Sequence, residues 1–131
     1  MNDTPYTVTA PGDMNATFAR AFNAGDIEQL LALYEPGGQL VQQGGRVAVG
    51  PEAMRTGLQA LLHLGGTMTS ENIYTFQAGD IALLRAHWRL TTTGEDGQPL
   101  VLEGQTAEVV RCQRDGRWLY VVDHPFGAGP L

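Results

Sequence analysis

The chain has 131 residues, of which 43% are hydrophobic and 17% charged, a composition typical of one globular domain with a buried core. Its formal net charge of −6 argues against a nucleic-acid-binding protein, because phosphate binding needs a basic patch. The single cysteine, Cys112, excludes an internal disulfide bond, and the three scattered histidines show no metal-ligand spacing, so we expect neither a metal nor a cofactor.

Neither a signal peptide nor a membrane-spanning segment is expected. The first residues lack a basic region followed by an apolar one, and no apolar run approaches the ~20 residues that span a bilayer, so we expect a cytoplasmic protein. Residues 1–12 contain Pro, Gly and Thr and are expected to form a flexible arm. A single domain at 13–126 and an irregular tail at 127–131 should follow.

The tetrapeptide AGDI at 24–27 is expected to separate two helices. Gly25 is a candidate stop for the first helix, which follows the candidate N-cap Asp13, and Asp26 is a candidate N-cap for the second. "EPGG" should end the second helix, because Pro36 cannot continue it. Apolar residues recur at helical spacing at Met14, Phe18, Ala21 and Phe22, and again at Ile27, Leu30, Leu31 and Tyr34.

A small hairpin and a third helix are expected next. "QLV" and "RVAV", separated by "QQGG", predict the hairpin. Pro51 suits the first position of the helix, which should end before Gly65. Its apolar stripe is Met54, Leu58, Leu61 and Leu62.

A second AGDI, at 78–81, is expected to form a hairpin turn, because the residues after it alternate between apolar and polar. One face should hold Ala82, Leu84, Ala86, Trp88 and Leu90, and the other Leu83, Arg85, His87 and Arg89. "VLEGQTAEVVRCQ" and "RWLYVVDH" predict a last pair of strands joined by "RDGR". Helices followed by an antiparallel sheet give an α+β architecture without internal repeat.

The register of the final strand stays open at this point. Thr106, Glu108, Val110 and Cys112 share one face of the preceding strand. A two-residue Asp115-Gly116 turn places Leu119, Val121 and Asp123 on that face, whereas a three-residue turn with Gly116 at a bulge places Trp118, Tyr120, Val122 and His124 there.

Four segments, "NAGDIEQLLALYEPGGQLV", "GPEAMRTGL", "GDIALLRAHW" and "RCQRDGRWLYVVDH", give the chain a resemblance to a known family. Their order and spacing resemble the nuclear transport factor 2-like (NTF2-like) superfamily, and within it the SnoaL-like and ketosteroid-isomerase-like group. The resemblance implies a cystatin-like cone, in which three N-terminal helices pack on a strongly curved, mixed but mostly antiparallel sheet around a pocket. It also implies a homodimer that pairs through the outer sheet face, where Arg85, His87 and Arg89 lie.

The functional residues of ketosteroid isomerases carry over poorly. Aligned on "GDIE", their donor tyrosine corresponds to Phe18, which has no hydroxyl, and their base aspartate to Gln42, an amide. Their second donor, an aspartic acid, corresponds to Glu108. Loss of the base and of one donor removes factors of about 10²–10⁴ and 10²–10³ in rate, so ketosteroid isomerisation is not expected.

Glu108, with Asp123 or His124, is the candidate acid–base group for other proton-transfer chemistry of an isomerase, cyclase or dehydratase. A structural interpretation competes, in which Glu108 pairs with an arginine. We expect Phe18, Phe22, Gln42, Trp88 and Val110 to contact a small apolar or carbonyl-bearing ligand. The alternative function is a non-catalytic module for homodimeric association or partner docking.

Overall fold

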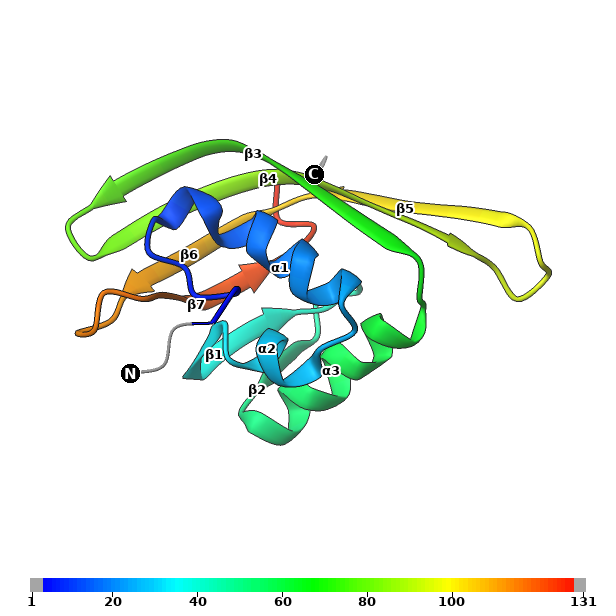
Figure 1. Ribbon diagram of the computed structural model, residues 1–131, viewed down its shortest axis with the longest axis horizontal. Coiled ribbons are helices and arrows are strands. Elements are labelled where there is room, and N and C mark those ends of the chain that lie inside the picture. The colour runs from blue at the N-terminus through cyan, green and yellow to red at the C-terminus, as the bar shows by residue number, and fades with distance from the viewer. Residues whose placement is uncertain (1–3, 129–131) are drawn as a thin grey trace.

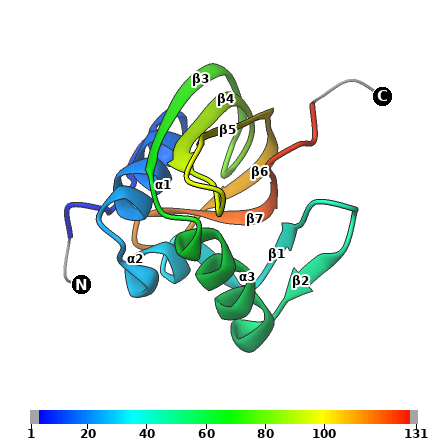
Figure 2. The same ribbon diagram turned by 90° about the vertical axis from the view of Figure 1, so that its right-hand side faces the viewer.

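The computed structural model describes residues 4–128, and its helices lie on one side of a curved sheet (Figures 1 and 2). The elements are η1 (Pro11–Asp13), α1 (Met14–Asn23), α2 (Ile27–Leu31), β1 (Tyr34–Val41), β2 (Val47–Val49), α3 (Pro51–His63), β3 (Thr67–Ala78), β4 (Ile81–Thr93), β5 (Pro99–Gln105), β6 (Ala107–Cys112) and β7 (Trp118–His124). The seven-stranded sheet has the order β2-β1-β7-β6-β4-β3, and β5 also pairs with β4. All pairs are antiparallel except β1 with β7, so the expected mixed α+β fold is confirmed.

The first AGDI separates α1 from α2, as predicted. Gly25 has a φ of 68° and donates its N–H to the Phe22 carbonyl at 2.9 Å, while the Asp26 N–H reaches the Ala21 carbonyl at 3.2 Å. This pair of bonds is a Schellman motif, which needs a left-handed residue and therefore favours glycine. The Asp26 carboxylate then accepts the Gln29 N–H at 3.1 Å and caps α2.

The predicted extent of the second helix is wrong. α2 ends at Leu31, and Tyr34 begins β1, where it pairs with Tyr120 of the parallel strand β7. Residue Glu35 precedes Pro36 and is restricted to extended backbone, so a helix could not pass through this point. A side chain at Gly38 would place its Cβ 3.0 Å from the Glu35 carbonyl oxygen and 3.1 Å from that of Tyr120. β1 therefore bulges against β7 at a position that only glycine fits comfortably.

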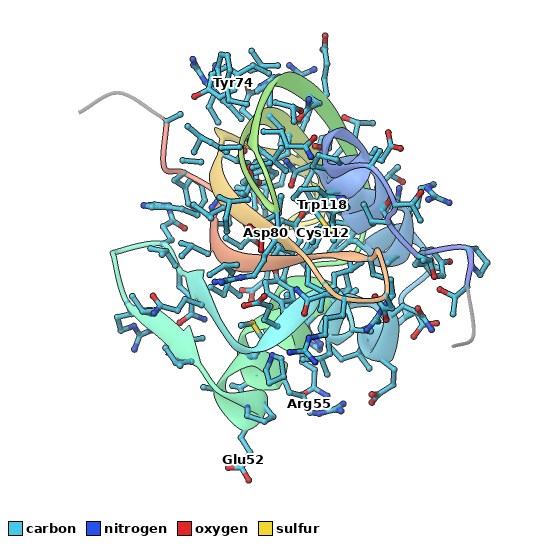
Figure 3. All side chains as sticks on the ribbon, turned by 90° about the vertical axis from the view of Figure 1, so that its left-hand side faces the viewer. Glu52, Arg55, Tyr74, Asp80, Cys112 and Trp118 are labelled. Carbon is cyan, nitrogen blue, oxygen red and sulfur yellow. The ribbon has the colours of Figure 1, made fainter. Side chains whose placement is uncertain are left out.

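The second AGDI forms the predicted two-residue turn between β3 and β4. Ala78 pairs with Ile81, and Gly79 has a φ of 63°. The five residues predicted to face inward from β4 are all buried, which confirms the alternation. The Cys112 N–H, at the end of β6, donates to the Asp80 carbonyl at 2.7 Å, and Figure 3 shows these two residues near each other.

The strand predicted between residues 101 and 113 is interrupted at Thr106, which separates β5 from β6. Both pieces continue to pair with β4. The turn before β7 has three residues, Arg114 to Gly116, closed by the Gln113 N–H to the Arg117 carbonyl at 2.7 Å. This turn sets the register of the first part of β7, in which Trp118 and Tyr120 face inward.

A β-bulge at Val121 then changes the register of β7. Val110 pairs with Tyr120 but Val109 pairs with Val122, so Val121 is an extra residue and Glu108 comes opposite Asp123. The register of the three-residue turn therefore applies up to Tyr120, and after the bulge the strand has the register that was predicted for the two-residue turn. The bulge places Asp123 inward, at 5% exposure, and leaves His124 on the other side of the alternation.

Part of the segment expected as an arm packs on the core. Val8 is buried, and its carbonyl accepts the Trp118 N–H at 2.9 Å. Residues 1–3 of that segment and 129–131 of the expected tail lie outside the described residues. Within 4–128, no helix is long and apolar enough to cross a membrane.

Candidate functional site

A cavity of about 270 Å³ lies between α1, α3, β1 and the concave side of the sheet. Its walls are mainly apolar and its inner end is polar. Phe18, Leu40, Leu58, Leu61, Met68, Trp88, Leu102 and Phe126 form most of the apolar lining, and Asn15, Thr106, Glu108, Tyr120 and Asp123 supply polar groups. No arginine or histidine is among the described residues that line it.

Two carboxyl groups from neighbouring strands meet at the polar end. Glu108 of β6 and Asp123 of β7 are register partners, which places their Cβ atoms about 5 Å apart. Their exposed fractions are 1% and 5%. Within residues 4–128, neither has an arginine or histidine partner, so the expected alternative of a Glu108–arginine pair is not seen.

Each carboxyl group accepts one strong hydrogen bond from a hydroxyl. Thr106 Oγ1 donates to Glu108 Oε1 at 2.5 Å, and Tyr34 Oη donates to Asp123 Oδ2 at 2.5 Å. This hydrogen bond explains why β1 begins at Tyr34. The buried Tyr34 hydroxyl would have no partner if the helix continued through this residue.

Burial is the main reason that both carboxyl groups bind protons tightly. Burial first, and then the negative charge of Asp123, raise the pKa of Glu108 to about 8, while the Thr106 hydroxyl and the Asn15 amide act in the opposite direction. Burial raises the pKa of Asp123 to about 6, against the hydrogen bond from Tyr34. At pH 7 the pair therefore carries close to one proton, mainly on Glu108.

Asn15 is a site residue that the sequence reasoning missed. Tyr120 donates its hydroxyl to Asn15 Oδ1 at 2.6 Å, and burial raises the pKa of Tyr120 so that it stays a donor. Asn15 is 6% exposed and lines the cavity, and its Nδ2 forms no hydrogen bond of normal geometry within 4–128, although it lies near enough to Glu108 to lower the pKa of that carboxyl group. A signal was available, since Asn15 lies three residues before Phe18 and seven before Phe22, on the same helix face.

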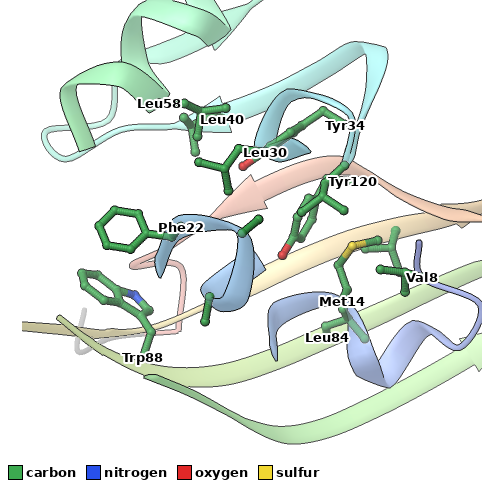
Figure 4. Packing of buried hydrophobic residues seen from close by; sticks show 14 of the residues in the cluster. Val8, Met14, Phe22, Leu30, Tyr34, Leu40, Leu58, Leu84, Trp88 and Tyr120 are labelled. Carbon is green, nitrogen blue, oxygen red and sulfur yellow. The ribbon is translucent and has the colours of Figure 1, made fainter. Parts of the chain in front are cut away.

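The other predicted site residues divide between the cavity and the core. Phe18, Gln42 and Trp88 line the cavity together with Glu108 and Asp123. Phe22 and Val110 are buried in the core instead, and Figure 4 shows Phe22 beside Trp88. His124 is also absent from the described lining; its Nδ1 lies 3.4 Å from the Phe126 N–H, beyond the Val121 bulge.

The outer end of the cavity is bounded by two close contacts. Trp88 Nε1 donates to the Pro125 carbonyl at 2.8 Å, and the Phe126 ring meets Trp88 edge to face at 5.6 Å. Gln42 lies against Gly57 of α3, where an added Cβ would come within 2.9 Å of Gln42 Nε2. The Gln42 amide, at the position that corresponds to the base of ketosteroid isomerases, therefore occupies the space that a side chain at Gly57 would fill.

The charged residues predicted for a dimer surface lie outside the cavity. Glu103 of β5 contacts His87 Nε2 at 3.1 Å and Arg89 at 3.5 Å, and Gln105 bonds Arg85. Among the described residues, no group of three or more His, Cys, Asp or Glu could hold a metal ion.

The curved mixed sheet, the helices beside it and the cavity between them define an NTF2-like α+β protein. The model of the SnoaL-like domain matches residues 15–121, and the chain belongs to this family. Among curated proteins, none matches the chain.

Solved structures support the fold. A ketosteroid isomerase-like protein from Erwinia carotovora atroseptica SCRI1043 has 22% identity and a TM-score of 0.79, covering 98% of this chain and 100% of its own. A Xanthomonas campestris protein, provisionally a calcium/calmodulin dependent protein kinase II association domain, has 20% identity and a TM-score of 0.74, with coverages of 98% and 100%. A Streptomyces avermitilis protein, provisionally a dehydratase of the NTF2-like family, has 18% identity and a TM-score of 0.72, with coverages of 88% and 92%.

Proposed function

We propose that the chain binds a small neutral, mainly apolar molecule that carries a carbonyl group, and catalyses proton transfer at the carbon next to that carbonyl. The observation that carries this proposal is the pair of buried carboxyl groups, Glu108 and Asp123, at the inner end of one apolar cavity without a cationic partner. Enzymes that move protons need neighbouring groups with different proton affinities, and this pair has them.

The roles follow from the protonation states near pH 7. Asp123 is mainly ionised and removes the proton from carbon, while the electron pair moves onto the carbonyl oxygen. Neutral Glu108 and the unpartnered Asn15 Nδ2 are hydrogen-bond donors for that oxygen as its charge develops. The proton then returns from Asp123 to a different carbon, which isomerises the ligand, or leaves with a hydroxyl group as water, which dehydrates it.

The lining supports a neutral ligand. A carboxylate or phosphate entering the cavity would lose its hydration and meet the Asp123 charge without any arginine or histidine among the described lining residues. The apolar walls offer dispersion contacts and favour rings or short chains that fit a volume of about 270 Å³.

A hydrogen-exchange experiment tests the proposed chemistry. A panel of neutral cyclic ketones is incubated with the protein in deuterated buffer, and exchange of the hydrogens next to the carbonyl is followed by NMR. We expect Asp123→Asn to lower the exchange rate of a responsive ketone by about 10²–10⁴-fold, the usual contribution of a general base. Glu95→Gln, on the exposed turn before β5, is the matched control. Exchange by Asp123→Asn at the wild-type rate would show that the proposal is wrong.

A second candidate function, homodimeric association, is favoured by the outer face of the sheet. Phe76 of β3 and Leu83 of β4 are register partners with exposed fractions of 63% and 42%. We propose that this face pairs two copies of the chain, which is compatible with ligand binding on the opposite, concave face.

A further inference from the structure

Thr106 occupies an irregular point in the sheet. In a regular antiparallel ladder, two residues of a hydrogen-bonded pair exchange both backbone bonds. Thr106 donates its N–H to the Ala86 carbonyl at 2.8 Å, but the return bond from the Ala86 N–H goes to Thr106 Oγ1, also at 2.8 Å. A side-chain hydroxyl therefore takes the place of a backbone carbonyl between β5 and β6.

This replacement fixes the direction of the hydroxyl. A backbone N–H can only donate, so Ala86 occupies one lone pair of Thr106 Oγ1. Thr106 is 4% exposed, and Glu108 Oε1, at 2.5 Å, is the only acceptor bonded to its hydroxyl within residues 4–128. A buried hydroxyl hydrogen without an acceptor is costly, so it points to Oε1 in either protonation state of Glu108.

The direction of this bond decides where Glu108 can carry its proton. Oε1 already accepts the Thr106 hydrogen, and a proton on the same oxygen would turn this acceptor from a carbonyl oxygen into a hydroxyl oxygen, which accepts hydrogen bonds more weakly. We propose that Thr106 is a positioning residue that fixes the proton of neutral Glu108 on Oε2. The Glu108 side chain then presents an O–H donor to the cavity rather than a carbonyl oxygen. That a ligand uses this O–H donor rests on the proposed function, whereas the position of the proton on Oε2 does not.

The surroundings of Glu108 are compatible with this arrangement. The titratable groups that face it are Asp123 and Tyr120 of β7 and Tyr34 of β1, and α1 contributes the Asn15 amide. Tyr34 donates to Asp123 and Tyr120 donates to Asn15, so neither phenol supplies a hydrogen to Glu108. Asn15 Nδ2 lies near enough to Glu108 to lower the pKa of its carboxyl group but forms no hydrogen bond with it in the described part of the chain, so Oε2 stays open to the cavity.

Infrared spectroscopy tests the proton position without a ligand. Protein labelled with ¹³C in glutamate only is compared at pH 6 and pH 10, and the protonated-carboxyl band of Glu108 is assigned by its loss in Glu108→Gln. We expect its C=O band in the wild type at the lower frequency of a hydrogen-bonded carbonyl. A band at the frequency of a carbonyl without a hydrogen bond would overturn the proposal, because the proton would then lie on Oε1.

Two variants make the test specific for Thr106. Thr106→Val keeps the shape but removes the hydroxyl, and we expect the C=O band to move to higher frequency and the pKa of Glu108 to rise by about one unit, because a charge-assisted hydrogen bond is lost. Thr106→Ser keeps the hydroxyl and should restore both values. An unchanged band in Thr106→Val, or no rescue by Thr106→Ser, would contradict the assignment. If Thr106→Val fails to fold, the wild-type band still decides. Failure of ketone exchange alone would concern only the proposed function.

Discussion

At the scale of single residues, Glu108 is the one of the two buried carboxyl groups whose ionisation costs the folded protein more free energy. It is buried without a cation, and its pKa in the fold, about 8, lies above the value of about 4.5 for an ordinary glutamate. Below pH 4.5 it is protonated in both the folded and the unfolded chain. Between these two values the unfolded chain releases the proton first, so the free energy of unfolding falls as the pH rises.

Glu108→Gln should therefore stabilise the protein at high pH. The amide has nearly the same shape and accepts the Thr106 hydroxyl, but it never has to ionise. We expect the gain in unfolding free energy over the wild type to grow between pH 5 and pH 8.5 by a few kcal/mol, on the order of 1.4 kcal/mol for each unit of pKa shift. Urea unfolding across this range measures the gain. A gain that does not depend on pH, or an equal response of the exposed Glu95→Gln control, would contradict the prediction.

At the scale of secondary-structure elements, Gly38 is a point where β1 approaches β7 so tightly that an added side chain has little room. Its Cα lies so close to β7 that an added Cβ would come within 3.1 Å of two backbone oxygens, those of Glu35 and Tyr120, which cannot move aside as a side chain can. Neighbouring Gly37 has no atom within 4 Å of the same added Cβ.

The two adjacent glycines provide a matched pair of variants. We expect Gly38→Ala to lower the free energy of unfolding by about 1–3 kcal/mol, the usual cost of overpacking, because β1 must move away from β7. Gly37→Ala should change it by less than about 0.5 kcal/mol, as for other surface substitutions. Urea unfolding of both variants is the measurement, and equal effects would show that the bulge is not tightly packed.

The elements that the sequence predicted correctly depend on local chemistry. Gly25 and Asp26 end and begin helices through bonds to residues within five positions, and the alternation from Ala82 to Leu90 reports which face of one strand is buried. These signals act within a few residues of the chain. The α+β class followed from them, whereas the expected position of Glu108 in the pocket came from the family resemblance and from the strand face that it shares with Val110.

The errors arose where distant partners decide the structure. Tyr34 continues a helical apolar pattern, yet it belongs to a strand because Asp123, 89 residues later, accepts its hydroxyl. The Val121 bulge was not predictable either, since both registers of β7 place apolar residues inward. The choice between Asp123 and His124 therefore had to stay open. Asn15, in contrast, could have been found from its position on the face of α1 that carries Phe18.

At the scale of the whole molecule, the two sides of the sheet differ in the surface that they present. The concave side holds the core and the cavity, whereas the outer side of β3 and β4 exposes apolar groups. The rings of Tyr74 and Phe76 pack against each other at 4.8 Å, and Figure 3 shows Tyr74 at the opposite end of the molecule from Glu52 and Arg55 of α3. Exposed apolar side chains gathered on one face are typical of an interaction surface.

We expect light scattering after size exclusion to give about twice the chain mass of 14.1 kDa at micromolar concentration. A stable dimer buries about 800 Å² on each partner, and the outer face of β3 and β4 supplies apolar groups with His87 and Arg89 around them. Phe76→Asp should give a monomer, because two copies of the new charge would be buried at the interface without a partner. Val47→Asp, at a comparably exposed position on β2, should stay dimeric. A wild-type monomer, or dissociation by both variants alike, would exclude this face as the interface.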